Sequence, residues 1–146
     1  MKYLYKIVIK LLVSPIRTGS IIICDVIIGL IIMNTKMRIL YWKEIPIQIQ
    51  TQDESEKISI LLDPCFQEAA DSLAMLEGSY GTDDYLDGWQ WSDEVEVLGD
   101  ARDSAKSTSE YYNSGFPRDL LSRLRDLHKE GKRDTRPGAI DQWFES

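Results

Sequence analysis

Two short runs of alternating hydrophobic and polar residues constrain the fold of this chain more than any other sequence feature. Isoleucine fills every second position from Ile45 to Ile49, and residues 57–62 repeat the pattern with Ile58, Ile60 and Leu62 in phase. A period of two is typical of a β-strand with one buried face. Because the polar, turn-like segment 52–56 joins the two runs, they predict an antiparallel hairpin.

Helical patterns follow the hairpin. Residues 64–77 carry apolar side chains at helical spacing, after a start signal at Asp63-Pro64 and before a glycine stop. A short helix is expected after Thr82, which we expect to cap it, then a return segment over residues 91–97 that includes a possible third strand. Two more helices are expected, over residues 101–112 and from Pro117 to about residue 130. A further strand, residues 37–42, precedes the hairpin. The elements predict an α+β fold, with a short antiparallel hairpin or small sheet packed against three to four helices.

Charge divides the chain unevenly. Residues 1–36 hold five basic residues and one acidic residue, a net charge of +4, which leaves −11 for the remainder of a chain with a total of −7. We therefore divide the chain into an extension (1–36), one domain (37–131) and a flexible C-terminal tail (132–146). In this tail, Ile140, Trp143 and Phe144 offer the alternative of folding back onto the core or docking elsewhere.

The extension has three interpretations that stay open. It is translated upstream sequence ahead of a true start at Met37, a weak signal or membrane anchor, or a folded extension. Its longest apolar stretch, residues 21–33, contains Asp25 and is shorter than the roughly 20 residues that a membrane-spanning helix needs. We expect a cytoplasmic protein, and a membrane-tethered domain only if the extension is native.

Few residues suggest chemistry. Cys65 lies in the first turn of a predicted helix, where a lowered pKa makes a thiol reactive, although packing explains it more simply. Asp84 and Asp87 share a helix face, but a solvated acidic surface explains them better than acid–base catalysis. A small enzyme or thiol-reactive protein using these residues is the alternative hypothesis. We predict no catalytic residue, no metal site, since the single histidine is His128, and no cofactor.

Aromatic residues indicate a candidate interaction surface. Its members are Tyr41, Trp42, Tyr85, Trp89 and Trp91. Such side chains stack on nucleic-acid bases in some proteins, but the strongly acidic domain repels phosphate backbones, so we expect no nucleic-acid partner. Tyrosine and tryptophan are favoured anchors in protein interfaces, so the expected partner is another protein.

Residues 41–46, Tyr-Trp-Lys-Glu-Ile-Pro, open a recognisable pattern. It continues with Phe-Gln-Glu-Ala-Ala-Asp at 66–71, Gly78, Thr82-Asp83, Tyr85-Leu86 and Trp89. On these residues the domain resembles the small bacterial virulence factor family, and a segment of the staphylococcal conserved virulence factor C that is joined there to HEAT-like repeats. The resemblance covers residues 37–98 and more loosely reaches about residue 127. It carries no catalytic residues, and it favours a soluble protein-interaction or regulatory module without catalytic activity.

Overall fold

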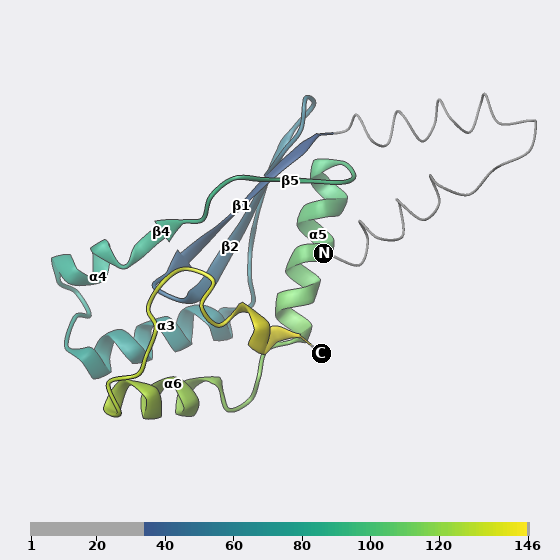
Figure 1. Cartoon of the computed structure of the whole chain (residues 1–146). Helices are drawn as coiled ribbons and strands as arrows, with labels where there is room; N and C mark the ends of the chain where they lie inside the picture. The colour runs from purple at the N-terminus through teal and green to yellow at the C-terminus, as the bar shows by residue number, and fades with distance from the viewer. Residues whose placement is uncertain (1–33, 146) are drawn as a thin grey trace, which may run out of the picture. The chain divides into compact units, whose positions relative to one another are not determined.

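The two alternating runs pair as an antiparallel hairpin, as predicted, within a larger antiparallel sheet (Figure 1). The computed structural model describes residues 34–145. In it, β1 (Thr35–Trp42) pairs with β2 (Ile45–Gln52), and β2 pairs with β3 (Lys57–Leu61). Two short strands, β4 (Trp89–Trp91) and β5 (Val95–Val97), pair with the other side of β1. The strand order is therefore β3-β2-β1-β4, with β5 also on β1.

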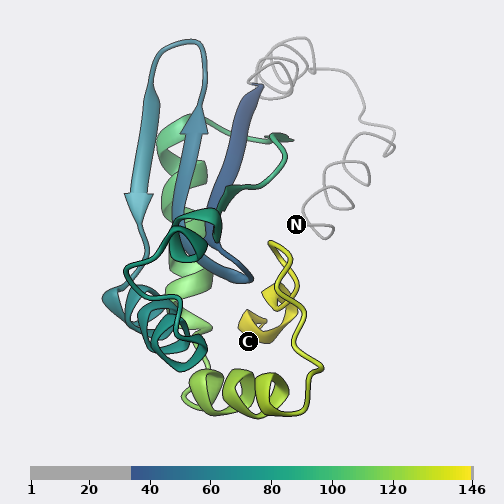
Figure 2. The same ribbon diagram turned by 90° about the vertical axis from the view of Figure 1, so that its left-hand side faces the viewer.

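Four α-helices and one 3-10 helix accompany the sheet, so the predicted α+β class is confirmed. They are α3 (Pro64–Glu77), α4 (Asp83–Asp87), α5 (Ala101–Ser114), α6 (Leu120–Lys129) and η1 (Asp141–Phe144). In Figure 2, which looks onto the strands, α5 lies behind them. Helices α3 and α5 contact the sheet, and α6 contacts α3.

Two helix starts differ from the sequence prediction. Helix α6 begins at Leu120, because Pro117 instead starts a turn in which the Leu120 amide donates to the Pro117 carbonyl at 3.1 Å. Thr82 precedes α4 as expected, but its hydroxyl donates to the Ser79 carbonyl at 2.6 Å and leaves the helix uncapped. In contrast, Asp100 caps α5, since its carboxylate accepts a hydrogen bond from the Asp103 amide at 2.8 Å.

A bulge lies where β1 and β2 approach their shared turn. Leu40 is opposite Gln48 and Tyr41 is opposite Pro46, so Ile47 is the extra residue. A proline at the second position of a strand beside a bulge removes little from the hydrogen-bonding ladder. The carbonyl of Ile47 instead accepts a hydrogen bond from the Leu62 amide at 2.9 Å.

The core lies between the sheet and the helices. Its fully buried members include Ile45, Ile49, Phe66, Leu73, Leu120, Leu124 and Phe144. Each large apolar side chain of this kind stabilises the fold by about 1.5–3 kcal/mol relative to exposure. The strand β1 begins two residues before the expected boundary at Met37. Its first residue, Thr35, is buried, and its hydroxyl donates to the Gly99 carbonyl at 2.5 Å.

The C-terminal segment folds back onto the core, which is one of the two alternatives that the sequence offered for it. Ile140 and Phe144 are buried. The Phe144 ring lies 5.5 Å from that of Phe66 and 5.3 Å from that of Tyr112. A Cβ added at Gly115 would lie 2.0 Å from the Phe144 carbonyl oxygen, so this close approach requires glycine. Residues 1–33, which include most of the expected extension, lie outside the described residues.

Candidate functional site

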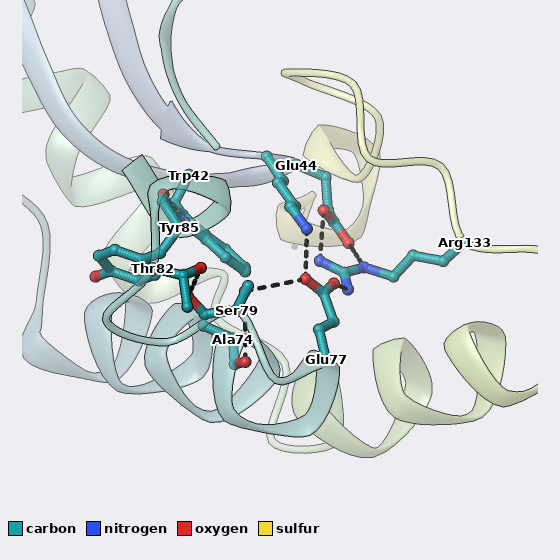
Figure 3. Close-up of polar contacts among 9 residues, drawn as sticks. Trp42, Glu44, Ala74, Glu77, Ser79, Thr82, Tyr85 and Arg133 are labelled. Carbon is teal, nitrogen blue, oxygen red and sulfur yellow. Dashed lines mark hydrogen bonds and ion pairs between the residues drawn. The ribbon is translucent and has the colours of Figure 1, made fainter. Parts of the chain in front are cut away.

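A cluster of aromatic rings joins the end of β1 to α4. The ring of Tyr85 is its centre, with centroids 5.7 Å from Trp42, 5.5 Å from Tyr80 and 6.1 Å from Trp89. The Trp42 indole Nε1 donates to the Tyr85 carbonyl at 3.1 Å (Figure 3). Tilted and edge-to-face contacts of this kind add to the stabilisation from burial alone.

Tyr85 is fixed from its other side by α3. Its hydroxyl donates to Asp71 Oδ1 at 2.9 Å, and Gln67 Nε2 donates to the Tyr85 hydroxyl at 3.3 Å. Burial, followed by the hydrogen bond to Asp71, raises the pKa of Tyr85. The phenol therefore stays protonated and positions α4 by hydrogen bonding.

The short helix α4 approaches β1 so closely that a side chain would not fit at Gly88. A Cβ there would lie 2.7 Å from Trp42 Nε1. The carbonyl of the same residue accepts a hydrogen bond from the Lys43 amide at 2.7 Å. Lys43 has a positive φ of 51° in the β1–β2 turn, which is uncommon for a residue other than glycine.

Part of this region is exposed, and we call that part the α4 corner. It consists of Tyr80, Tyr85, Leu86 and Trp89 with the three aspartates Asp83, Asp84 and Asp87. The side chains of Tyr80 and Leu86 are 52% and 64% exposed. All three aspartates are exposed, and none has an ion-pair partner among the described residues. The corner therefore combines apolar side chains on a fixed support with unpaired negative charge.

Behind the corner lies a buried ionic cluster that the sequence analysis did not predict. The Arg133 guanidinium donates to both carboxylate oxygens of Glu44, from Nε at 2.5 Å and from Nη2 at 3.0 Å, and also to Glu77 (Figure 3). Lys43 Nζ donates to the second oxygen of Glu77. The side chains of Arg133 and Glu44 are 3% and 0% exposed, so each charge depends on its partners.

Two causes act in opposite directions on Glu77. Burial alone would raise the pKa of this carboxyl, but the hydrogen bond from Lys43 and the charge of Arg133 together hold it below its ordinary value. Arg133 and Lys43 also lie over the Trp42 ring, 5.9 and 5.0 Å from its centroid. The only sequence signal of the cluster is the charged Lys43-Glu44 pair between two apolar strands.

Of the five residues predicted as an interaction surface, two lie in the core. Tyr41 is 3% exposed, because it lies on the core face of β1 and contacts Asp141 of the C-terminal segment. Trp42 is 0% exposed, because the α4 segment covers it. Tyr85, Trp89 and Trp91 are partly exposed. The structure brings Tyr85 and Trp89 together at the α4 corner, whereas Trp91 lies under the Arg38 guanidinium, 4.3 Å from it. Of the two buried residues, Trp42 supports the α4 corner, because its ring packs against that of Tyr85.

Tyr41 belongs to a second buried polar group. The hydroxyls of Tyr41 and Tyr112 both donate to Asp141 Oδ2, at 2.8 and 3.0 Å. The other oxygen, Oδ1, is buried and has no partner among the described residues. Burial raises the pKa of Asp141, although the two hydroxyls partly oppose this, and burial also raises the pKa of both tyrosines.

The candidates for catalysis do not come together. Cys65 is half-buried in the first turn of α3, and burial, followed by the charge of Asp63, raises the pKa of its thiol. A raised pKa lowers the thiolate fraction, which is the reactive species. Asp84 and Asp87 are exposed on α4. Among residues 34–145, no three His, Cys, Asp or Glu side chains are grouped to hold a metal ion.

The sequence model described as virulence factor matches residues 40–124, more than half of the chain. The chain belongs to the virulence factor family. The searches of curated proteins and of solved structures gave no match. The match includes Glu44, Glu77 and the α4 corner and ends before Arg133. Within the described part of the chain, no helix has the length and apolar character needed to cross a membrane.

Proposed function

We propose that this virulence factor domain is a protein-interaction module that binds a basic, partly apolar segment of a partner protein at the α4 corner. The observation that carries the proposal is the exposure of Leu86 and Tyr80 on an aromatic cluster that is fixed from below. Exposed apolar side chains scattered singly need no explanation, but those gathered over a rigid aromatic support are typical of interface anchors.

The support for the corner reduces the cost of binding. Tyr85 is hydrogen-bonded to α3 and its backbone to Trp42, so α4 is already ordered before a partner arrives. Each side chain that needs no further ordering saves about 0.5–1.5 kcal/mol on association. The corner is therefore preorganised for docking.

Charge specifies the class of partner. Asp83, Asp84 and Asp87 surround the apolar side chains without ion-pair partners in the described residues, and the whole chain carries −7. Complementary charge steers association and selects against wrong partners. A partner segment with lysine or arginine beside leucine or aromatic residues fits this surface.

The test uses the full chain and a helical peptide of leucine and lysine as the probe, with affinity measured by isothermal titration calorimetry. Replacing Leu86 by serine removes an apolar anchor without changing charge, and we expect affinity to fall about tenfold. Leu61→Ser is the matched control, because Leu61 is similarly exposed, at 69%, on β3. We expect it to bind as the wild type does.

Three results would overturn the proposal. One is no binding of the leucine–lysine peptide. The second is an equal loss of affinity in the two serine variants, and the third is equally tight binding of a peptide in which glutamate replaces lysine. An additional variant, Asp84→Asn, checks the charge, since it should weaken binding at low ionic strength and have little effect at high ionic strength.

A further inference from the structure

The sheet has one face that the helices leave open. Side chains alternate along the strands, so Lys36 and Arg38 of β1, Gln50 of β2, and Lys57 and Ser59 of β3 point away from the buried face. Figure 2 looks onto this side of the strands. We call these residues, together with Gln52, the open face. In contrast to the core face, it is polar and carries positive charge.

The register places these side chains in two neighbouring rows. Lys36 is opposite Gln52, which is opposite Lys57, and Arg38 is opposite Gln50, which is opposite Ser59. Adjacent strands lie about 4.8 Å apart, so the two lysines are separated by about 10 Å, with the arginine about 7 Å along from the first. Three cations therefore occupy an area that one extended peptide can span.

Arg38 is held in place by contacts that leave most of its donors free. Its Nε donates to Gln50 Oε1 at 2.8 Å, and Gln50 in turn donates to the Ser59 hydroxyl at 3.2 Å. Its guanidinium lies 4.3 Å from the centroid of the Trp91 ring. Among the described residues, no carboxylate lies within ion-pair distance of Arg38. The terminal nitrogens thus remain available, in a fork that matches a carboxylate.

A shallow depression connects the cations. Its lining includes Lys36, Arg38, Lys57 and Glu94, together with polar residues of β2. Glu94 is the one carboxylate of this lining, and it pairs with Lys36 at 3.0 Å where both side chains are about half exposed. Glu96 of β5 also lies opposite Lys36, so three cations meet two carboxylates on this face. Arg38 and Lys57 are the two of these cations that have no ion pair among the described residues.

We infer that the open face binds an extended acidic segment of a partner protein, with one carboxylate on the free donors of Arg38 and others near Lys36 and Lys57. The depression is shallow and polar, unlike the deep apolar pockets that hold small molecules. Nucleic acid is disfavoured more strongly than a short acidic segment, because a polyphosphate brings a denser negative charge against a chain of net charge −7. The inference is independent of the α4 corner, which takes a partner of the opposite charge.

The experiment measures binding of a fluorescent peptide of alternating glutamate and serine to the full chain, by anisotropy at low ionic strength. Arg38→Met should weaken binding by about tenfold, the equivalent of about 1.4 kcal/mol. Arg123→Met is the matched control: Arg123 also lies over a tryptophan, 3.9 Å from the Trp143 ring, and the change of charge is identical. It should leave binding unchanged.

Lys57→Met provides a second variant at the end of β3, with no ion pair in the described residues to lose, and should weaken binding severalfold even if Arg38→Met fails to fold. The inference is overturned if the glutamate peptide does not bind, if it binds no better than its glutamine counterpart, or if the Arg38 and Arg123 variants lose affinity equally. Tighter binding of inorganic phosphate or of a single-stranded oligonucleotide would also overturn it.

Discussion

Of the three arginines in residues 34–145 that lie over tryptophan rings, Arg133 and Arg38 have very different surroundings. Arg133 lies over Trp42, where its side chain is 3% exposed and donates to Glu44 and Glu77. Arg38 lies over Trp91 on the open face, where its one described hydrogen bond is to an uncharged amide. Arg133 is thus enclosed by carboxylates, whereas Arg38 is stacked on a ring and has no carboxylate partner among the described residues.

The difference follows from burial. A buried guanidinium needs a carboxylate and good hydrogen-bond geometry, because an unpaired charge away from water costs several kcal/mol. An exposed guanidinium has water for its free donors, so no carboxylate is required and those donors can exchange water for a ligand. An arginine–tryptophan pair therefore stabilises the fold at Arg133 and Trp42, whereas the pair at Arg38 and Trp91 keeps donors that a ligand can use.

The largest expected effect on stability comes from disrupting the buried ion pair between Arg133 and Glu44. Glu44→Gln keeps the shape of the side chain but leaves the buried Arg133 with half of its counter-charge, and we expect a loss of about 3–5 kcal/mol in the free energy of unfolding, measured by urea denaturation. Asp134→Asn is the control, since Asp134 also pairs with an arginine, Arg136, but on an exposed surface. Equal stability of the two variants would contradict the role given to burial.

An intermediate effect is expected at Gly88, which touches the enclosed tryptophan. In Gly88→Ala the new methyl group would lie 2.7 Å from Trp42 Nε1, so the indole must shift. Overpacking of this kind costs about 1–3 kcal/mol, measured again by urea denaturation. Gly131→Ala is a useful reference, because its positive φ of 67° adds strain without any neighbouring atom within 4 Å. The tryptophan fluorescence of the chain, to which Trp42 contributes as one of four, should change in the Gly88 variant alone. An unchanged spectrum would contradict a tightly held Trp42 indole.

A smaller effect is expected for Asp141, a buried carboxyl that has hydroxyl partners and, within residues 34–145, no ion-pair partner. Burial raises its pKa in the folded state above the ordinary 3.8, so its contribution to stability is greatest at low pH and is lost as the pH rises through the folded value. Asp141→Asn removes this dependence. At neutral pH we expect a change within about 1 kcal/mol, because the amide oxygen still accepts from the tyrosines.

The pKa of Glu77 is shifted in the opposite direction to that of Asp141, which makes the Asp141 variant informative. Its folded pKa lies below the ordinary 4.5, so the stability it contributes is present above that value and is lost as the pH falls through the folded one. In the wild type, the effects of Glu77 and Asp141 on the pH dependence of stability partly cancel in acid. Asp141→Asn should therefore lose stability more steeply than the wild type below about pH 4.5, by urea titrations across pH. A shallower loss in the variant would contradict this assignment.

The sheet and helices could be predicted because their signals are local. The alternation of Ile45, Ile47 and Ile49 specifies which face of β2 is buried, and Gly78 adopts the left-handed conformation that ends α3. These patterns act over a few residues and do not depend on which segments meet in space. The family resemblance, carried by residues 41–46 and by further residues as far as Trp89, is confirmed by the match over residues 40–124.

The sites could be predicted only in part, because they depend on contacts between distant segments. Residue type alone predicts Trp42 as a surface anchor. In the structure it is covered by the α4 segment, which lies more than 40 residues further along the chain. Arg133 lies 89 residues from Glu44, and Asp141 lies 100 residues from Tyr41. No sequence pattern or spacing predicts contacts between residues so far apart in the chain. That Tyr85 and Trp89 lie together could be predicted, because they belong to one short segment.

The central claim is that one arginine–tryptophan pair holds the fold while the other is left free for a ligand. Urea denaturation of Arg133→Met and Arg38→Met, measured side by side, tests it most directly. Removing Arg133 leaves the buried Glu44 without a cation and Glu77 with Lys43 alone, and it should cost about 3–5 kcal/mol. Removing Arg38 should change stability by about 0.5 kcal/mol or less. Equal losses in the two variants would contradict the claim.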